Sequence, residues 1–310
     1  MKPNTQVKIR NIIMENPVMP ASGTFGIEMK ELLDFNKLGA MLPKSITYKA
    51  KEGNPPRRLM ETPSGMLNAV GIQNKGIHYF LEHEVAEFEK FNSPLIISIS
   101  GYSTEEFIEM VKLLQARDGV DGIELNISCP NLAVGGESFG MDPVATHDIV
   151  RAVRRYTDKA IIAKLTPNVG DITLIAKAAQ EGGADAVSLI NTVTAMAIDI
   201  RTRKPILGNI TGGLSGPAIK PLAVRMVWEV ANAVTVPVIG VGGIMNSDDA
   251  VEFLIAGASA VQVGTANFVT PSIMEDVIIG IEKYMTDYGF NSIKDLSGSI
   301  ITGNSEITCY

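Results

Sequence analysis

The segment Gly122-Ile-Glu-Leu-Asn-Ile-Ser-Cys-Pro-Asn131 decides which fold this chain is predicted to adopt. Its first part, up to Asn126, has the apolar character of a short buried strand. Just past that strand come a thiol (Cys129), a proline that stiffens the backbone (Pro130) and a second amide (Asn131). A core strand needs none of these groups at its end. The segment therefore indicates a strand that carries a functional site at its carboxyl end.

Short apolar strands recur along the chain, and each is followed by a segment with helical spacing. The strands are predicted at 17–21, 40–42, 94–100, 122–126, 160–165, 186–190, 237–241 and 259–263. The helices are predicted at 28–38, 77–91, 103–114, 142–156, 171–181, 217–233, 247–256 and 271–288. Strands that are apolar throughout are typical of a parallel sheet covered on both faces. Eight such units favour an α/β fold of the closed (β/α)8 (TIM) barrel type over an open doubly wound sheet.

The segments outside this alternation complete a single predicted domain, residues 1–310. Residues 5–16 alternate loosely and predict an N-terminal hairpin. Two long βα loops, 46–75 and 193–214, are expected to lie over the active site, because long loops in a compact domain usually cover something. The polar residues from about 289 to 310 predict a loosely structured tail.

Composition excludes several classes of function. The 310 residues are 45% apolar and carry a net charge of -7, which argues against binding nucleic acid or an anionic membrane. No apolar run approaches the roughly 20 residues of a membrane span, and the first residues lack a secretory h-region. The 2 cysteines are too few for a disulfide framework or an iron–sulfur cluster held by this chain. A soluble protein of a reducing compartment, located in the cytoplasm, is expected.

Polar residues stand at nearly every predicted strand end, where a barrel of this type carries its functional groups. They are Ser22, Lys44, Ser98, Asn126, Lys164, Asn191, Gly242-Gly243 and Gly264-Thr265. Loops after strands are often polar by default, but the glycine pairs end the last two strands at matching positions. Exposed backbone N–H groups there predict a phosphate-bearing cofactor. Neither GxxxxGK[ST] nor a GxGxxG that opens a helix is present, so ATP and dinucleotide modes are not supported.

Three side chains have both a structural and a functional interpretation. Lys44 and Lys164 either extend to water or meet an anion, such as a substrate carboxylate or negative charge on a cofactor. Cys129 is either a small buried hydrophobe or a general base. The 3 histidines fall within predicted helices at no metal-ligand spacing, so no metal site is predicted.

Three motifs carry a resemblance to a known family. The stretches 124–131 (ELNISCPN), 64–74 (SGMLNAVGIQN) and 208–221 (GNITGGLSGPAIKP) together resemble class 1 dihydroorotate dehydrogenases. The similarity is greatest to the catalytic subunit of the NAD-dependent kind, class 1B, and extends from about Val7 to Tyr288. The resemblance implies a flavin mononucleotide (FMN) barrel that oxidises dihydroorotate to orotate in the synthesis of pyrimidines and UMP.

The resemblance also implies a role for each matching residue. Cys129 would take the proton from C5 of the substrate while hydride leaves C6 for flavin N5, and Lys44 would contact both flavin and substrate. Flavin contacts are implied for Ser22, Lys44, Ser45, Asn126, Lys164, Ile190, Gly216, Gly242, Gly243, Gly264 and Thr265. Substrate contacts are implied for Lys44, Asn68, Ala69, Val70, Gly71, Ile72, Asn126, Asn131, Asn191 and Thr192. Ser98 departs from the family, which commonly has Asn there.

Class 1B enzymes pass electrons to NAD through a separate subunit that carries FAD and a 2Fe–2S cluster. The resemblance therefore implies a homodimer of this chain together with such a partner. Three alternatives remain: a fumarate-dependent, class 1A-like dihydroorotate oxidase; a dihydropyrimidine dehydrogenase subunit; and a non-catalytic metabolite-binding barrel. The loop Asn68–Ile72 differs from class 1A substrate loops.

Overall fold

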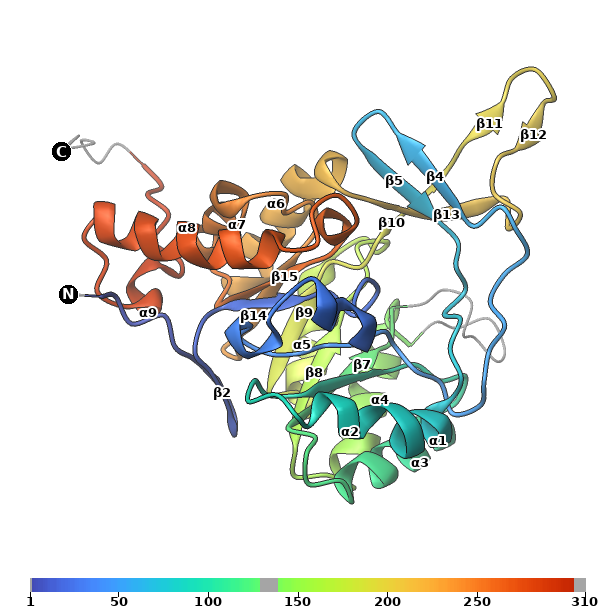
Figure 1. The fold of residues 1–310 in the computed structure, drawn as a ribbon, viewed down its shortest axis with the longest axis horizontal. Helices are drawn as coiled ribbons and strands as arrows, with labels where there is room; N and C mark the ends of the chain where they lie inside the picture. The colour runs from blue at the N-terminus through green and yellow to red at the C-terminus, as the bar shows by residue number, and fades with distance from the viewer. Residues whose placement is uncertain (1, 129–138, 304–310) are drawn as a thin grey trace.

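A parallel sheet curled into a barrel forms the centre of the molecule (Figure 1). The structure, a computed structural model, describes residues 2–128 and 139–303. The 7 strands lie in the order β3-β15-β14-β9-β8-β7-β6. Their bounds are β3 Val18–Pro20, β6 Ile96–Ile99, β7 Gly122–Asn126, β8 Ala160–Lys164, β9 Ala186–Leu189, β14 Val238–Val241 and β15 Ala260–Val263. All but one of the predicted strands are present, and the TIM-barrel prediction is confirmed.

The remaining predicted strand, 40–42, joins the two edges of this sheet without forming a regular strand. The N–H of Gly39 donates to the carbonyl of Val18 in β3 at 2.8 Å. Met41 donates to Pro94 O at 2.8 Å and accepts from Ile96 N of β6 at 2.9 Å. Pro43 interrupts the pairing, because proline has no N–H to donate, and Ile46 N donates to Ser98 O of β6 at 2.9 Å beyond it. The segment closes the barrel.

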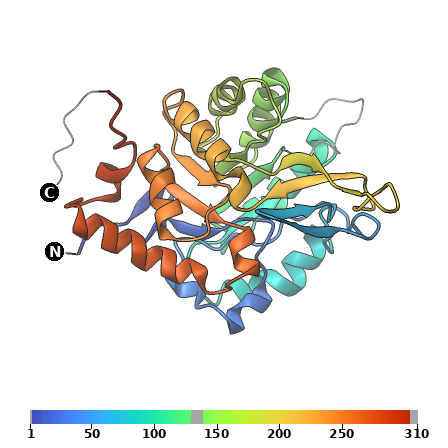
Figure 2. The ribbon, with the colours of Figure 1, turned by 90° about the horizontal axis from the view of Figure 1, so that it is seen from above.

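Helices cover the outside of the barrel, as Figure 2 shows from above. The long ones are α3 Thr104–Gln115, α4 Pro143–Arg154, α5 Ile172–Glu181, α6 Lys220–Ala231, α7 Ser247–Ile255 and α8 Ile273–Asp287. Ser103, Asp142 and Asp171 act as N-caps and accept hydrogen bonds from backbone N–H groups of α3, α4 and α5. Their starts therefore lie where local sequence places them. A 3₁₀ turn, η4 Pro217–Ile219, precedes α6, and another, η5 Thr265–Phe268, follows β15.

Two predicted helices differ from expectation. Residues 28–38 form two short 3₁₀ helices, η1 Ile27–Glu31 and η2 Phe35–Lys37, because the Asp34 side chain accepts from Asn36 N and starts a new turn. Residues 77–91 divide into α1 Ile77–Tyr79, a π-helical turn η3 Phe80–Glu84, and α2 Val85–Phe88.

The predicted hairpin is present as β1 Val7–Ile9 and β2 Ile12–Met14, paired antiparallel. It packs against the start of β7, since a Cβ at Gly122 would lie 2.7 Å from Ile12 Cδ1. The hairpin therefore covers the amino end of the barrel, opposite the strand ends predicted to carry the site.

The two segments predicted as long loops contain strands, which pair into a second sheet above the barrel (Figure 2). Its antiparallel order is β10-β13-β5-β4, with β4 Leu59–Thr62, β5 Gly65–Asn68, β10 Val193–Met196 and β13 Thr211–Ser215. The sequence did not predict these strands, because their glycines lower strand propensity. Here a Cβ at Gly65 would lie 2.1 Å from Ser215 O, and one at Gly213 would lie 2.0 Å from Thr192 Oγ1. The close packing of the second sheet therefore requires glycines, and these same glycines weaken the strand pattern in the sequence.

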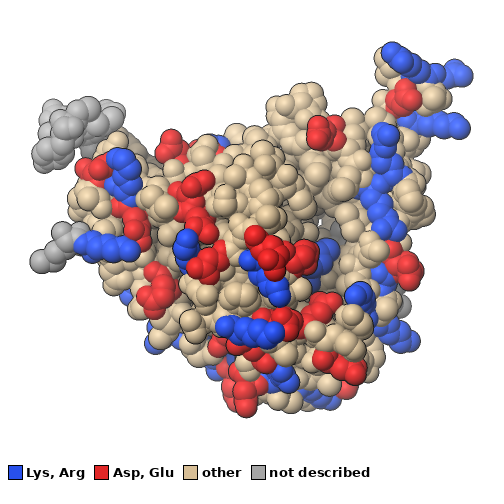
Figure 3. All heavy atoms as spheres, in the orientation of Figure 1, with Lys and Arg blue, Asp and Glu red and all other residues tan. Residues whose placement is uncertain are grey.

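Beyond this sheet, a small hairpin projects from the molecule: β11 Ile198–Asp199 and β12 Lys204–Pro205. Figure 3 shows Lys and Arg gathered at its tip, which includes the exposed Arg201, Arg203 and Lys204. Over the rest of this face, acidic and basic side chains are interspersed. In the described part of the chain, no helix has the length and apolar character needed to cross a membrane.

The predicted tail, about 289–310, contains regular structure near its start, while 304–310 lie outside the described residues. A short helix, α9 Ile293–Leu296, packs its apolar side chains inward, and Leu296 is fully buried. The carbonyl of Asn4 accepts from Ile293 N at 2.8 Å, which joins the two ends of the chain. The sequence did not predict this helix, because only two of its residues, Ile293 and Leu296, are apolar and buried.

We expect Leu296→Ala to lower the free energy of unfolding by about 2–5 kcal/mol, since it leaves a cavity where a buried leucine stood. Urea unfolding at equilibrium measures the change. Lys294→Ala, an exposed substitution in the same helix, is the matched control and should change stability by no more than about 0.5 kcal/mol. Equal stability of the two variants would show that α9 adds nothing to the core.

Candidate active site

A cavity of about 320 Å³ lies between the carboxyl ends of the barrel strands and the second sheet. Every predicted flavin or substrate contact within the described residues lines it. These are Ser22, Lys44, Ser45, Asn68, Ala69, Val70, Gly71, Ile72, Asn126, Lys164, Ile190, Asn191, Thr192, Gly216, Gly242, Gly243, Gly264 and Thr265. Cys129 and Asn131 lie outside the described residues. The fold thus gathers into one cavity residues that the sequence spreads over most of its length.

A buried lysine stands at the floor of the cavity. Lys164, at the end of β8, is only 5% exposed, so it does not extend to bulk water. Its Nζ donates to Ser22 Oγ at 3.1 Å and lies 3.8 Å from a carboxylate oxygen of Glu124 on β7. The structure therefore does not favour the interpretation in which Lys164 extends to water; its side chain lies beside the buried carboxylate of Glu124. Lys44, the other predicted lysine, lines the cavity as well.

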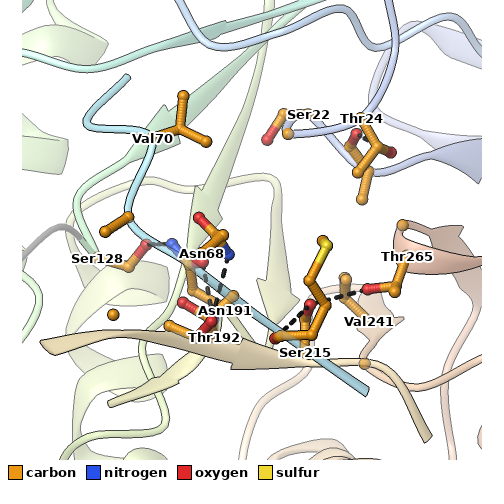
Figure 4. Close-up of a pocket in the computed structure, with 18 of the residues that line it drawn as sticks. Ser22, Thr24, Asn68, Val70, Ser128, Asn191, Thr192, Ser215, Val241 and Thr265 are labelled. Carbon is orange, nitrogen blue, oxygen red and sulfur yellow. Dashed lines mark hydrogen bonds between the residues drawn. The ribbon is translucent and has the colours of Figure 1, made fainter. Parts of the chain in front are cut away.

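A chain of neutral groups forms one wall. Asn126 Nδ2 donates to Ser45 Oγ at 3.3 Å, and Ser128 Oγ donates to Asn126 Oδ1 at 2.7 Å. Asn191 Nδ2 donates in turn to Ser128 Oγ, as Figure 4 shows. Ser98 does not line the cavity; it is fully buried, and its Oγ lies 2.9 Å from Ser45 Oγ. These hydrogen bonds between neutral groups fix the side-chain amides of Asn126 and Asn191.

Glycines shape the opposite wall, where Thr265 Oγ1 donates to Ser215 Oγ (Figure 4). Gly216, Gly242 and Gly243 have φ angles of 90°, 132° and 79°, in the region that side chains disfavour. A Cβ at Gly243 would lie 2.9 Å from Gly216 O, so the loops after β13 and β14 touch there. The wall is built of backbone, which suits an anionic group such as a phosphate.

An ion-pair cluster supports that glycine wall from outside. Lys220, the first residue of α6, lies 2.6 Å from Asp249 and 2.6 Å from Glu252 of α7. The hydrogen bonds that these two carboxylates accept raise the pKa of Lys220. Asp249 also accepts from Met245 N at 2.9 Å, so the cluster fixes the loop that follows β14.

The second sheet forms the roof. Asn68 Nδ2 donates to Gly213 O at 3.3 Å, which joins β5 to β13 above the cavity. The chain then turns at Gly71 and Ile72, with φ angles of 77° and 54°. Asn54 Nδ2 donates to Ala69 O at 3.1 Å and holds this turn from the side. The stretch 68–72 thus lines the cavity.

Sequence reasoning missed two functional candidates. Asn168 lines the cavity, donates to Thr192 O at 3.1 Å and accepts from Thr194 N at 2.9 Å, so it fixes the start of β10. Its position just past a strand end was the available signal. Glu124, a charged residue inside an apolar strand, is fully buried beneath Lys164, and that mismatch was also visible in the sequence.

Within residues 2–128 and 139–303, no cluster of three or more His, Cys, Asp or Glu side chains is arranged to hold a metal ion. The polar groups around the cavity are amides, hydroxyls, lysines and backbone instead.

Comparison with known proteins decides the family. The model of the family described as dihydroorotate dehydrogenase matches residues 4–285. The chain belongs to the dihydroorotate dehydrogenase family. Dihydroorotate dehydrogenases are flavin-dependent oxidoreductases, and the family predicted from the three sequence motifs is confirmed.

Relatives extend the match to nearly the full chain. The chain is 51% identical over 301 residues to the "Dihydroorotate dehydrogenase B (NAD(+)), catalytic subunit" of Citrifermentans bemidjiense, covering 96% of this chain and 99% of that protein. It is 52% identical over 299 residues to the protein of the same description from Thermoanaerobacter sp., again covering 96% and 99%. A third, from Alkaliphilus metalliredigens, is 52% identical over 301 residues, with the same coverage.

Proposed function

We propose that this chain oxidises (S)-dihydroorotate to orotate in de novo pyrimidine biosynthesis, with FMN as the hydride acceptor. One observation carries the proposal: a dihydroorotate dehydrogenase family chain gathers a buried lysine, neutral amides and a glycine wall around a single cavity. These are the groups that a phosphate-bearing flavin and a small anionic pyrimidine require.

The lining of the cavity supports FMN as the cofactor. The backbone of Gly216, Gly242 and Gly243, with Gly264 and Thr265, would hold its phosphate. Ser22, Ser45, Asn126, Lys164 and Ile190 would hold the ring system, as predicted from the resemblance. FMN would supply the hydride acceptor, and the ammonium of Lys164 would stabilise the negative charge of the reduced ring.

The substrate would lie against the amide wall and the roof. Asn68, Asn126, Asn191 and Thr192, with the predicted Asn131, offer both donors and acceptors to the edges of a pyrimidine ring. The turn 69–72 would cover the ring, and the ammonium of Lys44 would meet the substrate carboxylate. Cys129, predicted from the resemblance as the general base, would remove the proton from C5.

We propose further that electrons leave for NAD through a partner subunit. The relatives are described as NAD(+)-dependent catalytic subunits, which supports a separate electron-transfer subunit. Its FAD and 2Fe–2S cluster, the homodimer of this chain and the cytoplasmic location stay predictions from the resemblance.

The proposal is tested by colour. The purified protein should be yellow with one FMN per chain, and anaerobic dihydroorotate should bleach the flavin absorbance. Dihydrouracil should bleach it at least about 100-fold more slowly, because it lacks the carboxylate that a charged hydrogen-bond donor would recognise. A colourless protein, or a yellow one that dihydroorotate leaves unchanged, contradicts the proposed function. Equal rates with both compounds would favour a dihydropyrimidine substrate.

A further inference from the structure

The floor beneath Lys164 contains a buried carboxylate that the proposed reaction does not use. Glu124 lies on β7 and is fully buried. Its Oε2 accepts two hydrogen bonds, from Ser188 Oγ at 3.1 Å and from Gln262 Nε2 at 3.0 Å. Its Oε1 accepts none from the described residues, although it too is buried, and it is the oxygen that lies 3.8 Å from Lys164 Nζ.

The two oxygens of the Glu124 carboxylate have different partners. Both neutral donors, from β9 and β15, go to the same carboxylate oxygen, and the other oxygen is left facing the ammonium. Burying a carboxylate without a partner charge costs several kcal/mol, and so does burying an ammonium. Each group therefore depends on the other. Among the described residues, the other charged side chain that lines the cavity above them is Lys44, while Ser22, Ser188 and Gln262 are neutral.

We propose that Glu124 is a positioning residue: it holds the Lys164 ammonium, with its charge, at the cavity floor. The inference rests on the proposed function, because it assigns Lys164 a constant positive charge beneath FMN. Ser22 Oγ and a carboxylate oxygen of Glu124 both lie close to Nζ, so Glu124 supplies the counter-charge of the ammonium in either oxidation state of the flavin. Reduction of the flavin then draws no proton onto Lys164.

The midpoint potential of bound FMN, measured against pH, tests this directly. In Glu124→Gln, Lys164 has lost its counter-charge. Its side chain should then be protonated only when the reduced flavin supplies a negative charge. Reduction should then take up one extra proton, and the potential should fall more steeply with pH than in the wild type. One extra proton in a two-electron reduction steepens the slope by up to about 30 mV for each tenfold change in proton concentration. At the acid end, the variant should lie above the wild type.

Two variants serve as controls. Ser188→Ala removes one hydrogen bond to Glu124 Oε2 but keeps the carboxylate, so it should keep the wild-type slope. Glu124→Gln combined with Lys164→Gln removes both charges, so it should also keep that slope. Wild-type and Glu124→Gln curves that run parallel would overturn the inference, as would an equally steep slope in the double variant.

The same coupling is measurable without flavin. In urea unfolding of the flavin-free protein, Lys164→Gln should restore stability that Glu124→Gln alone loses, because it removes the unpaired ammonium. If Glu124→Gln does not fold, the double variant still should, and its failure to fold would overturn the inference. A wild-type protein that binds no FMN contradicts the proposed function, whereas a flavin-loaded wild type with an unchanged Glu124→Gln curve contradicts this inference alone.

Discussion

Replacing Cys129 with alanine should lower the rate of dihydroorotate oxidation by about 10²- to 10⁴-fold, the usual contribution of a general base. FMN should stay bound, because Cys129 is not among the flavin contacts named above. The wild-type rate should rise with pH as the thiol ionises, and the variant should lose that dependence. Anaerobic stopped-flow reduction of the bound flavin, recorded from about pH 6 to pH 9, measures both effects on the chemical step itself.

The chain offers its own control for this experiment. Cys309 is its other cysteine, and Cys309→Ala should react at the wild-type rate. Cys129→Ser should retain more activity than alanine at alkaline pH, because a hydroxyl keeps a proton-accepting oxygen at that position. A Cys129→Ala protein with wild-type rates across the pH range would show that another group removes the proton.

Replacing Gly243 with alanine should lower FMN affinity at least about 100-fold and yield a colourless protein, since the backbone that would hold the phosphate must move. The residue has a φ of 79°, and its new Cβ would lie 2.8 Å from Lys220 Cβ and 2.9 Å from Lys220 N. Lys220 cannot move freely, because Asp249 and Glu252 hold it. The strain should cost about 1–3 kcal/mol of stability.

Gly170→Ala is the matched control for this substitution. No heavy atom lies within 4 Å of the Cβ it would gain, and it does not line the cavity. It should bind FMN as the wild type does. Flavin released by heat and measured by fluorescence gives the occupancy of each protein, and urea unfolding gives its stability. Full FMN occupancy in Gly243→Ala would show that the phosphate binds elsewhere.

Local sequence was sufficient for much of the fold. β7 has the predicted bounds, Gly122–Asn126, because a short apolar run between a turn and a polar segment is a local signal. α4 and α5 begin where Asp142 and Asp171 cap them, for the same reason. The second sheet could not be predicted, since its strands gain stability only by pairing β5 with β13, which are far apart in the chain.

For the site, the sequence indicated which residues end the strands, and the family motifs indicated what they bind. It did not indicate what holds them. Ser98, where the family commonly has Asn, does not line the cavity, and its Oγ lies 2.9 Å from Ser45 Oγ. The mutual arrangement of Asn126, Ser128 and Asn191 likewise depends on how neighbouring strands are brought together.

The sequence by itself determined the order of strands and helices, the strand ends that meet at one mouth, and the family. Only the tertiary structure decided that Glu124 faces Lys164 and that Gln262, 138 residues further along, donates to the same carboxylate. The physical reason is range. Strand and helix signals come from neighbours a few residues apart, whereas a buried charge finds its partner only after the barrel closes and removes both from water.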